Sequence, residues 1–217
     1  MPIIQSRLDT DFYQFTMGQF LFRRYRNIQG VDRFINRTTS VPLHEIINET
    51  DLRRELDALQ HLQCKTDELD YLACYQTESG KFIFREDYLK FLETLVLPNY
   101  SVKFTRDGIK LEFPGPLVET TYWETPSLAI IDELYTQACV AKLSKTAYEL
   151  HRRQRMIGIW HKIATVQAHL NVIFSDFGTR RRFSQEWHEY IVSVLLRHVS
   201  STQFIGTSNV WLAKKYG

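Results

Sequence analysis

VIFSDFGT (172–179) and TQFIGTSN (202–209) are two short apolar runs, and each contains a glycine–threonine pair at or near its end. The stretch between them carries apolar side chains at helical spacing, namely Trp187, Tyr190, Ile191, Val194 and Leu195. Strand, glycine turn, helix, strand and glycine turn make a βαβ unit, which implies parallel strands joined by a right-handed crossover. The fold class predicted for this part of the chain is therefore α/β.

The two glycine–threonine turns fall at the carboxyl ends of the expected strands. In α/β barrels and open α/β sheets, chemistry gathers at those ends. Two parallel strands cannot make a buried sheet alone, because such a sheet needs cover on both faces. Strand counting therefore predicts that the chain is a fragment, with an incomplete parallel sheet where it stops at Gly217.

Residues 1–124 are predicted to form an α+β domain, and 125–217 a second domain. Helical spacing predicts a helix from Phe12 to Phe22 with Thr10 or Asp11 as N-cap, two helical pieces over 51–75 with Asp51 as cap, and a helix over 81–95. Alternating polarity predicts a strand over 31–39 and an antiparallel meander of 101–105, 109–113 and 117–123. Asp107–Gly108 is a hairpin signal, and Pro114–Pro116 is expected to be a turn.

The second domain is expected to begin with a long helix. Thr125 suits the N-cap position, and Pro126 suits the first helical position. Apolar spacing carries this helix to about residue 155, and a further helix over 156–170 is expected before the first strand.

Composition is typical of a globular protein. Of 217 residues, 44% are hydrophobic and 24% charged, and 27 Lys and Arg against 25 Asp and Glu give a net charge of +2. This balance gives no general affinity for nucleic acid. Cys64, Cys74 and Cys139 lack the spacing of a zinc site or a disulfide framework, which favours a cytoplasmic location. Neither a signal peptide nor a transmembrane helix is expected, and no membrane partner.

Three segments could carry chemistry. The arginines of Arg180–Arg182 offer permanently charged groups for phosphate or carboxylate, although a solvated run is equally compatible with the composition. The small polar residues of 206–209 could hydrogen-bond an anion, or could simply cap a helix. Tyr13 could stack on a flat ring, although packing is the more common role of such a residue.

Other common sites lack support in the sequence. Neither a P-loop nor a GxGxxG motif is present. The histidines show no metal-ligand pairing with a carboxylate and are interpreted as structural or surface residues; they include His61, His161, His169, His188 and His198.

Taken together, LDTDFYQFTM (8–17), FSDFGTRRR (174–182) and GTSNVWLAKKYG (206–217) resemble the nicotinate phosphoribosyltransferases, in that family's order and at about its spacing. The resemblance covers essentially the whole chain. It implies an α+β N-terminal domain followed by an irregular α/β barrel, of which only the first part lies within 125–217. It also implies a homodimer with a shared active site.

The resemblance further implies roles for individual residues. Nicotinate would lie between Tyr13, donated by the partner chain, and Phe177. Arg180 would bind an anionic group, and Thr207 and Ser208 would line the substrate site. Related nicotinamide enzymes carry an acid at the position of Ser208, and a neutral side chain there suits a carboxylate ligand because a second carboxylate would repel it.

The implied reaction joins nicotinate to phosphoribosyl pyrophosphate, giving nicotinate mononucleotide and pyrophosphate in NAD salvage. ATP and Mg²⁺ are expected cofactors of the full-length enzyme, which is formally classed with ligases. A phosphorylated histidine is expected beyond Gly217, so no catalytic residue is assigned here and the 217-residue chain is expected to be inactive by itself. Three alternatives stay open: a nicotinamide-type enzyme, a nucleic-acid-binding module using Arg180–Arg182, and a truncated protein that only dimerises.

Overall fold

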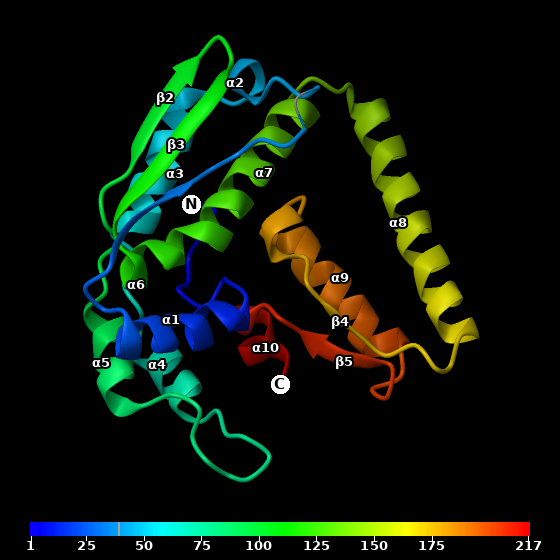
Figure 1. Ribbon diagram of the computed structural model, residues 1–217. Coiled ribbons are helices and arrows are strands. Elements are labelled where there is room, and N and C mark those ends of the chain that lie inside the picture. Colours follow the sequence, from blue (N-terminus) through cyan, green and yellow to red (C-terminus); the bar gives the residue numbers. More distant parts are fainter. Residues whose placement is uncertain (39) are drawn as a thin grey trace.

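The computed structural model describes residues 1–38 and 40–217 (Figure 1). Its helices are α1 (Phe12–Arg24), α2 (Leu43–Ile46), α3 (Glu49–Gln60), α4 (Thr66–Ala73), α5 (Glu86–Thr94), α6 (Leu117–Thr120), α7 (Glu124–Ala141), α8 (Lys145–Ala168), α9 (Gln185–His198) and α10 (Val210–Tyr216). Its strands are β1 (Gln29–Arg33), β2 (Ser101–Thr105), β3 (Gly108–Pro116), β4 (Phe174–Asp176) and β5 (Phe204–Thr207). Two short 3₁₀ turns are η1 (Thr121–Trp123) and η2 (Thr179–Arg181).

The N-terminal sheet is antiparallel, with strand order β1-β3-β2. The hairpin predicted at Asp107–Gly108 is confirmed, because β2 and β3 pair across it. The prediction of a third strand in the meander is wrong, because residues 117–123 form α6 and η1. The second neighbour of β3 is β1, which pairs with it antiparallel. The segment is nevertheless buried at almost every position from Val118 to Trp123, a pattern that fits a helix inside a core and not a half-exposed strand.

The expected turn at Pro114–Pro116 is also wrong, since these residues extend β3. Leu117 donates its N–H to Ile28, so by alternation Gly115 also faces β1 while the two prolines face the other side. There β2 has already ended, because its pairing stops at Ser101 opposite Glu112. A proline nitrogen is tolerated at such an unpaired edge.

Several helix boundaries differ from those expected. The helical pieces within 51–75 and 81–95 are confirmed, but Asn48 caps α3 by accepting the N–H groups of Thr50 and Asp51, so Asp51 is not the cap. Asp11 does occupy the N-cap position of α1.

In the second half, Thr125 lies inside α7, because this helix continues directly from η1. The single helix expected to run to about residue 155 is interrupted at 142–144. The Ser144 hydroxyl then caps α8 by accepting the Ala147 N–H. The second helix predicted over 156–170 is therefore the continuation of α8. The strand expected over 31–39 is limited to β1, and residue 39 lies outside the described residues.

The main core lies between the antiparallel sheet and its helices. Trp123 is fully buried there, stacks on Phe113 at 4.7 Å between ring centroids, and donates its indole N–H to the carbonyl of Pro98 at 3.1 Å. A smaller core forms beneath the parallel strands, from Ile163, Val194, Val199 and Phe204. None of the helices in the described part of the chain is both long and apolar enough to cross a membrane.

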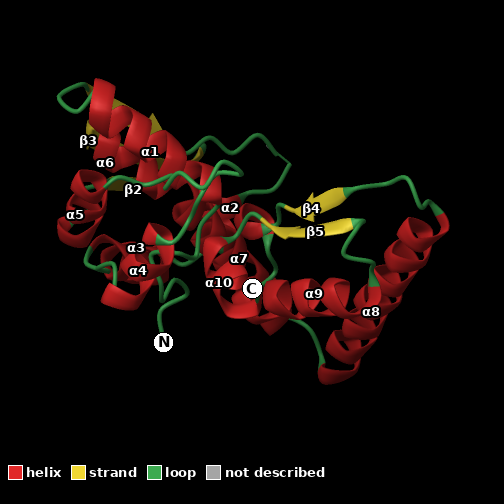
Figure 2. Cartoon of the chain, turned by 90° about the horizontal axis from the view of Figure 1, so that it is seen from below, coloured by secondary structure: helices red, strands yellow, loops and turns green. Residues whose placement is uncertain are grey.

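The βαβ unit is confirmed. β4 and β5 are parallel neighbours and α9 packs against them, as Figures 1 and 2 show from two directions. The two ends of the chain meet at this unit: the N–H of Phe12 donates to the carbonyl of Ser208 at 2.8 Å, and that of Val210 donates to Thr10 at 3.0 Å. The N-terminal arm therefore lies against the turn that follows β5.

Candidate functional site

Two aromatic rings face each other at the junction of the two halves. Tyr13 comes from the first turn of α1 and Phe177 from the loop after β4, with ring centroids 6.2 Å apart and planes 15° from parallel. A flat ring between them would need about 7 Å, because each contact takes about 3.5 Å. A small opening of the pair would therefore admit one heteroaromatic ring.

Tyr13 is anchored at its hydroxyl, which donates to Glu124 Oε2 at 3.0 Å. Burial raises the pKa of the Tyr13 phenol, so the hydroxyl keeps its proton at neutral pH. Phe177 is 53% exposed, so its ring is the more accessible of the two.

Arg180 is the cation beside this ring pair. It lies on η2, with its guanidinium carbon 5.7 Å from the Phe177 ring centroid. Its nearest acids are Glu124 Oε1 at 3.4 Å and Asp11 Oδ2 at 3.7 Å, and 35% of its side chain is exposed. Both ion pairs are long for charge-assisted hydrogen bonds, so this arginine can turn toward an incoming anion without breaking a tight contact.

Ser208 lies beside the N-terminal arm, and all of its polar groups form hydrogen bonds. Its hydroxyl donates to Asp11 Oδ1 at 2.7 Å, its N–H donates to the Asp176 carbonyl at 2.9 Å, and its carbonyl accepts from Phe12. The hydroxyl hydrogen is thus committed to Asp11. Asp11 Oδ2 is buried and has no hydrogen-bond partner among the described residues, with Arg180 as its nearest cation.

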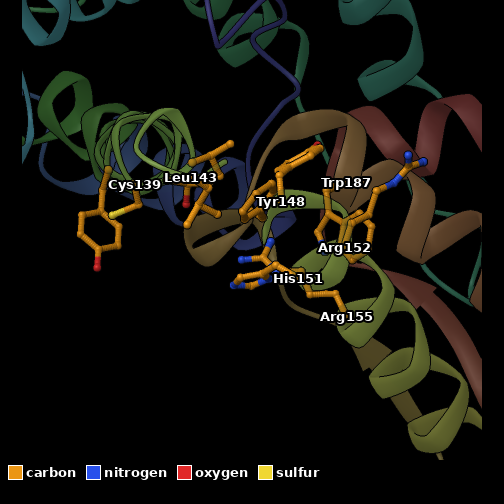
Figure 3. Close-up of a pocket in the computed structure, with 11 residues that line it drawn as sticks. Cys139, Leu143, Tyr148, His151, Arg152, Arg155 and Trp187 are labelled. Atoms are coloured by element: carbon orange, nitrogen blue, oxygen red, sulfur yellow. The ribbon is translucent and has the colours of Figure 1, made fainter. Parts of the chain in front are cut away.

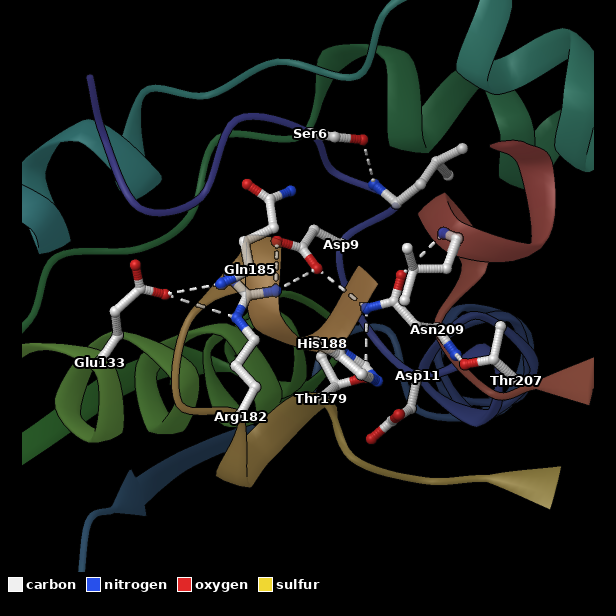
Figure 4. Close-up of polar contacts among 12 residues, drawn as sticks. Ser6, Asp9, Asp11, Glu133, Thr179, Arg182, Gln185, His188, Thr207 and Asn209 are labelled. Carbon is white, nitrogen blue, oxygen red and sulfur yellow. Dashed lines mark hydrogen bonds and ion pairs between the residues drawn. The ribbon is translucent and has the colours of Figure 1, made fainter. Parts of the chain in front are cut away.

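A buried polar cluster lies beneath the arm (Figure 4). Arg182 Nη1 donates to both carboxylate oxygens of Asp9, at 2.6 and 2.8 Å, and Asn209 Nδ2 donates to the same carboxylate at 2.9 Å. Arg182 Nε lies 3.6 Å from Glu133 Oε2. Asn209 also caps α10 by accepting the Leu212 N–H. The cluster joins the arm, α7, the loop after η2 and the turn before α10.

Thr207 and His188 meet at Asp176. Both Thr207 Oγ1 and His188 Nε2 lie 2.7 Å from Asp176 Oδ2. Burial would raise the pKa of the Asp176 carboxyl, but hydrogen bonds from His188 and Thr207 outweigh it and hold the pKa below its ordinary value. His188 is therefore paired with a carboxylate, which the sequence interpretation of the histidines did not anticipate.

The structure brings three of the predicted site residues together: Tyr13, Phe177 and Arg180. Ser208 is linked to Arg180 through Asp11, whose two carboxylate oxygens face these two residues. The hydroxyl of Thr207 donates to Asp176 Oδ2 and so supports the turn. Its expected place in the substrate site stays a prediction. Tyr13 faces Phe177 of its own chain, and the expectation that a partner chain supplies this ring stays a proposal.

The acids of the site were missed by sequence reasoning. Asp9 and Asp11 lie within the arm 8–17, and Asp176 immediately precedes Phe177, but none was assigned a role in the site. Glu124 could not be found from the chain order, because it lies at the start of α7 and meets Tyr13 only in the folded protein. A run of acids in an apolar N-terminal arm is the one signal that was available, since buried carboxylates require partners.

A separate cavity of about 290 Å³ opens between α7, α8 and the start of α9. Figure 3 shows Cys139, Leu143, Tyr148, His151, Arg152, Arg155 and Trp187 around it. None of the residues of the ring pair or the buried cluster lines this cavity. The candidate site is therefore assigned to the ring pair, where aromatic faces, a cation and buried acids converge.

Metal ligands are not grouped in this part of the protein. Within residues 1–38 and 40–217, no three His, Cys, Asp or Glu side chains come together as a metal ion would require.

Comparison with known proteins gives two family matches. The nicotinate phosphoribosyltransferase (NAPRTase) N-terminal domain matches residues 8–132, and the nicotinate phosphoribosyltransferase (NAPRTase) family matches residues 172–217. A nicotinate phosphoribosyltransferase from Porphyromonas gingivalis has a similar structure, with a TM-score of 0.73 and 29% identity over 99% of this chain and 52% of that one.

Two further solved structures are alike in fold. A putative nicotinate phosphoribosyltransferase from Saccharomyces cerevisiae has a TM-score of 0.78 and 24% identity, covering 100% of this chain and 53% of that one. A nicotinate phosphoribosyltransferase from Vibrio cholerae has a TM-score of 0.77 and 20% identity, covering 99% of this chain and 49% of that one. The chain spans about half the length of each of these proteins.

Proposed function

Because the chain belongs to the nicotinate phosphoribosyltransferase family, we propose that it supplies the pyridine-binding part of that enzyme. The reaction is the joining of nicotinate to phosphoribosyl pyrophosphate, coupled to ATP and giving nicotinate mononucleotide and pyrophosphate. The observation that supports this most is the near-parallel pair of Tyr13 and Phe177, with Arg180 at its side.

Each residue of the pair has a distinct task in this proposal. Tyr13 and Phe177 hold the two faces of the pyridine ring, which is a favourable arrangement for flat heteroaromatic rings. Arg180 turns from Glu124 and Asp11 toward the carboxylate of nicotinate. Holding the ring in a fixed orientation presents its nitrogen to the ribosyl carbon, and such positioning lowers the entropic part of the barrier.

A nicotinamide-type enzyme is the nearest alternative. Ser208 has committed its hydrogen to Asp11, so only its lone pairs can face a ligand, and this would suit the N–H groups of an amide. Arg180 favours the carboxylate instead, because charge-assisted hydrogen bonds are about twice as strong as neutral ones. We therefore keep nicotinate as the proposed substrate.

The nucleic-acid alternative loses its basis in the fold. Arg182 is 1% exposed and bound to Asp9, and Arg180 lies between two acids. The three arginines therefore do not form a basic patch. A homodimer stays a proposal that rests on the resemblance, because the ring pair is complete within one chain. The cytoplasmic location likewise stays a proposal, supported by the three free cysteines.

Ligand-detected NMR tests the proposal directly. Saturation transfer from the protein to nicotinic acid should be strong with the wild-type chain and lost with Tyr13→Ala. Equal transfer to both proteins would show that the ring pair is not the binding site. The expected inactivity of the isolated chain is tested separately, and detectable nicotinate mononucleotide formed by it would contradict that expectation.

A further inference from the structure

Asp176 occupies the position where the two glycine–threonine turns of the fold meet. It is the last residue of β4 and directly precedes Phe177, and its carboxylate binds Thr207, which directly precedes Ser208. Its backbone carbonyl accepts the Ser208 N–H at 2.9 Å. One residue therefore contacts both glycine–threonine turns, of which one carries Phe177 and the other carries Ser208.

The backbone ladder is weak at this point. The pairing of β4 with β5 passes from Phe174 opposite Phe204 to Asp176 opposite Thr207, so β5 contains one extra residue between them. Gly206, with φ of 121°, lies in this irregularity, in a conformation that side chains rarely adopt. A bulge of this kind disrupts ladder hydrogen bonds and bends the strand. The ends of β4 and β5 therefore need side-chain contacts to hold their separation.

His188 completes the contact from the helix side. It is 3% exposed on α9, and its Nε2 atom lies 2.7 Å from Asp176 Oδ2. The turn passes close above this pair: a Cβ atom at Gly178 would lie 2.9 Å from Asp176 Oδ1 and 3.1 Å from His188 Nε2. Glycine at 178 thus lets the Phe177 turn rest directly on the Asp176–His188 pair.

We propose that Asp176 is a positioning residue of the pyridine site, which acts through Thr207 and His188 to set where Phe177 and Ser208 stand. This inference rests on the proposed function for its consequence, but its structural claim can be measured without a ligand. In the proposal, Thr207 acts on the turn and makes no contact with substrate.

Hydrogen exchange at the Ser208 amide is the direct readout, because that amide donates to Asp176. Thr207→Val keeps the shape of the side chain and removes its hydroxyl, and should raise exchange at this amide about tenfold or more, since hydrogen bonds to charged groups are among the stronger ones. Thr207→Ser should restore it. Thr105→Val is the matched control, because it removes a hydroxyl bond to Gly108 in the distant hairpin and should leave Ser208 unchanged.

Two further variants address dependence on Asp176. His188→Gln retains a hydrogen-bond donor but not the imidazole geometry, and should also raise exchange at Ser208. In an Asp176→Asn background, Thr207→Val should add little, because residues that act through one partner have non-additive effects. Additive effects, or unchanged exchange at Ser208 in Thr207→Val and His188→Gln, would overturn the proposal.

Titration with nicotinic acid separates this inference from the proposed function. Thr207→Val should weaken nicotinate binding about tenfold while Thr105→Val does not. Faster exchange with undiminished nicotinate affinity would overturn the positioning role. If the wild-type chain binds no nicotinate but the exchange result holds, the proposed function fails while the contact between the two turns is supported.

Discussion

Arg182 and Asp9 form a buried ion pair although 173 positions separate them in the chain. Their side chains are 1% and 0% exposed, and one guanidinium nitrogen donates to both carboxylate oxygens. The pair fastens the N-terminal arm to the loop after η2. Because Tyr13 follows the arm at the start of α1 and Phe177 directly precedes η2, the pair fixes the frame in which the ring site forms.

Removal of Arg182 should therefore destabilise the protein. Arg182→Gln leaves the Asp9 carboxylate buried with only Asn209 as donor, which should lower the free energy of unfolding by about 3–5 kcal/mol. Urea denaturation measures this loss. Arg181→Gln is the matched control at an exposed position next in the chain, and should change stability by no more than about 0.5 kcal/mol. Similar losses for both variants would contradict the assigned burial.

The three arginines show where sequence reasoning reaches its limit. The pattern predicted an anion-related role for Arg180–Arg182 as a run, but a 3₁₀ turn directs successive side chains to different sides. Arg180 faces the ring pair, whereas Arg182 enters the core to meet Asp9. That division depends on the arm from the far end of the chain, which local pattern cannot reveal.

Loss of the Tyr13 ring should weaken nicotinate binding. Tyr13→Ala removes one face of the stack, and stacking of a base on an aromatic side chain contributes about 1–3 kcal/mol, so the dissociation constant should rise about 5-fold to 150-fold. Tyr13→Phe keeps the ring and loses only the bond to Glu124, and should change it about threefold. Calorimetric titration distinguishes the two, and an equal loss in both variants would argue against stacking.

Arg180 should determine the preference for a carboxylate. Arg180→Gln removes the positive charge beside the ring pair, so nicotinate binding should weaken about tenfold while nicotinamide binding stays nearly constant. Parallel titrations of both pyridines measure the change in preference. Equal weakening of nicotinate and nicotinamide binding in this variant would show that Arg180 maintains the structure of the site and does not determine its specificity.

Glu133 should make stability depend on pH. Burial raises the pKa of its carboxyl from 4.5 to about 7, although Arg182 acts in the opposite direction. Between those values the folded protein holds more protons than the unfolded chain, so the free energy of unfolding falls as the pH rises through this window. Relative to Glu133→Gln, the wild type should lose about 1–3 kcal/mol of its free energy of unfolding between pH 4.5 and 7.5. A pH-independent difference in the two denaturation series would contradict the raised pKa.

The fold was predictable where local pattern and tertiary environment agree. The βαβ unit follows from its glycine turns and the spacing between them, and α3, α4 and α5 follow from leucine spacing. The strand prediction for residues 117–123 failed because burial on all sides outweighed the alternating pattern of polarity. The pairing of His188 with Asp176 was hidden for another reason: these residues come from a helix and a strand end, and only the crossover brings them together.

The central claim is that Tyr13 and Phe177 hold a pyridine carboxylate, and calorimetric titration of nicotinic acid and nicotinamide tests it most directly. The wild-type chain is predicted to bind nicotinic acid more tightly than nicotinamide, and Phe177→Ala is predicted to lose both. Binding of nicotinic acid that is unchanged in Phe177→Ala, or no binding to the wild type, would contradict the claim.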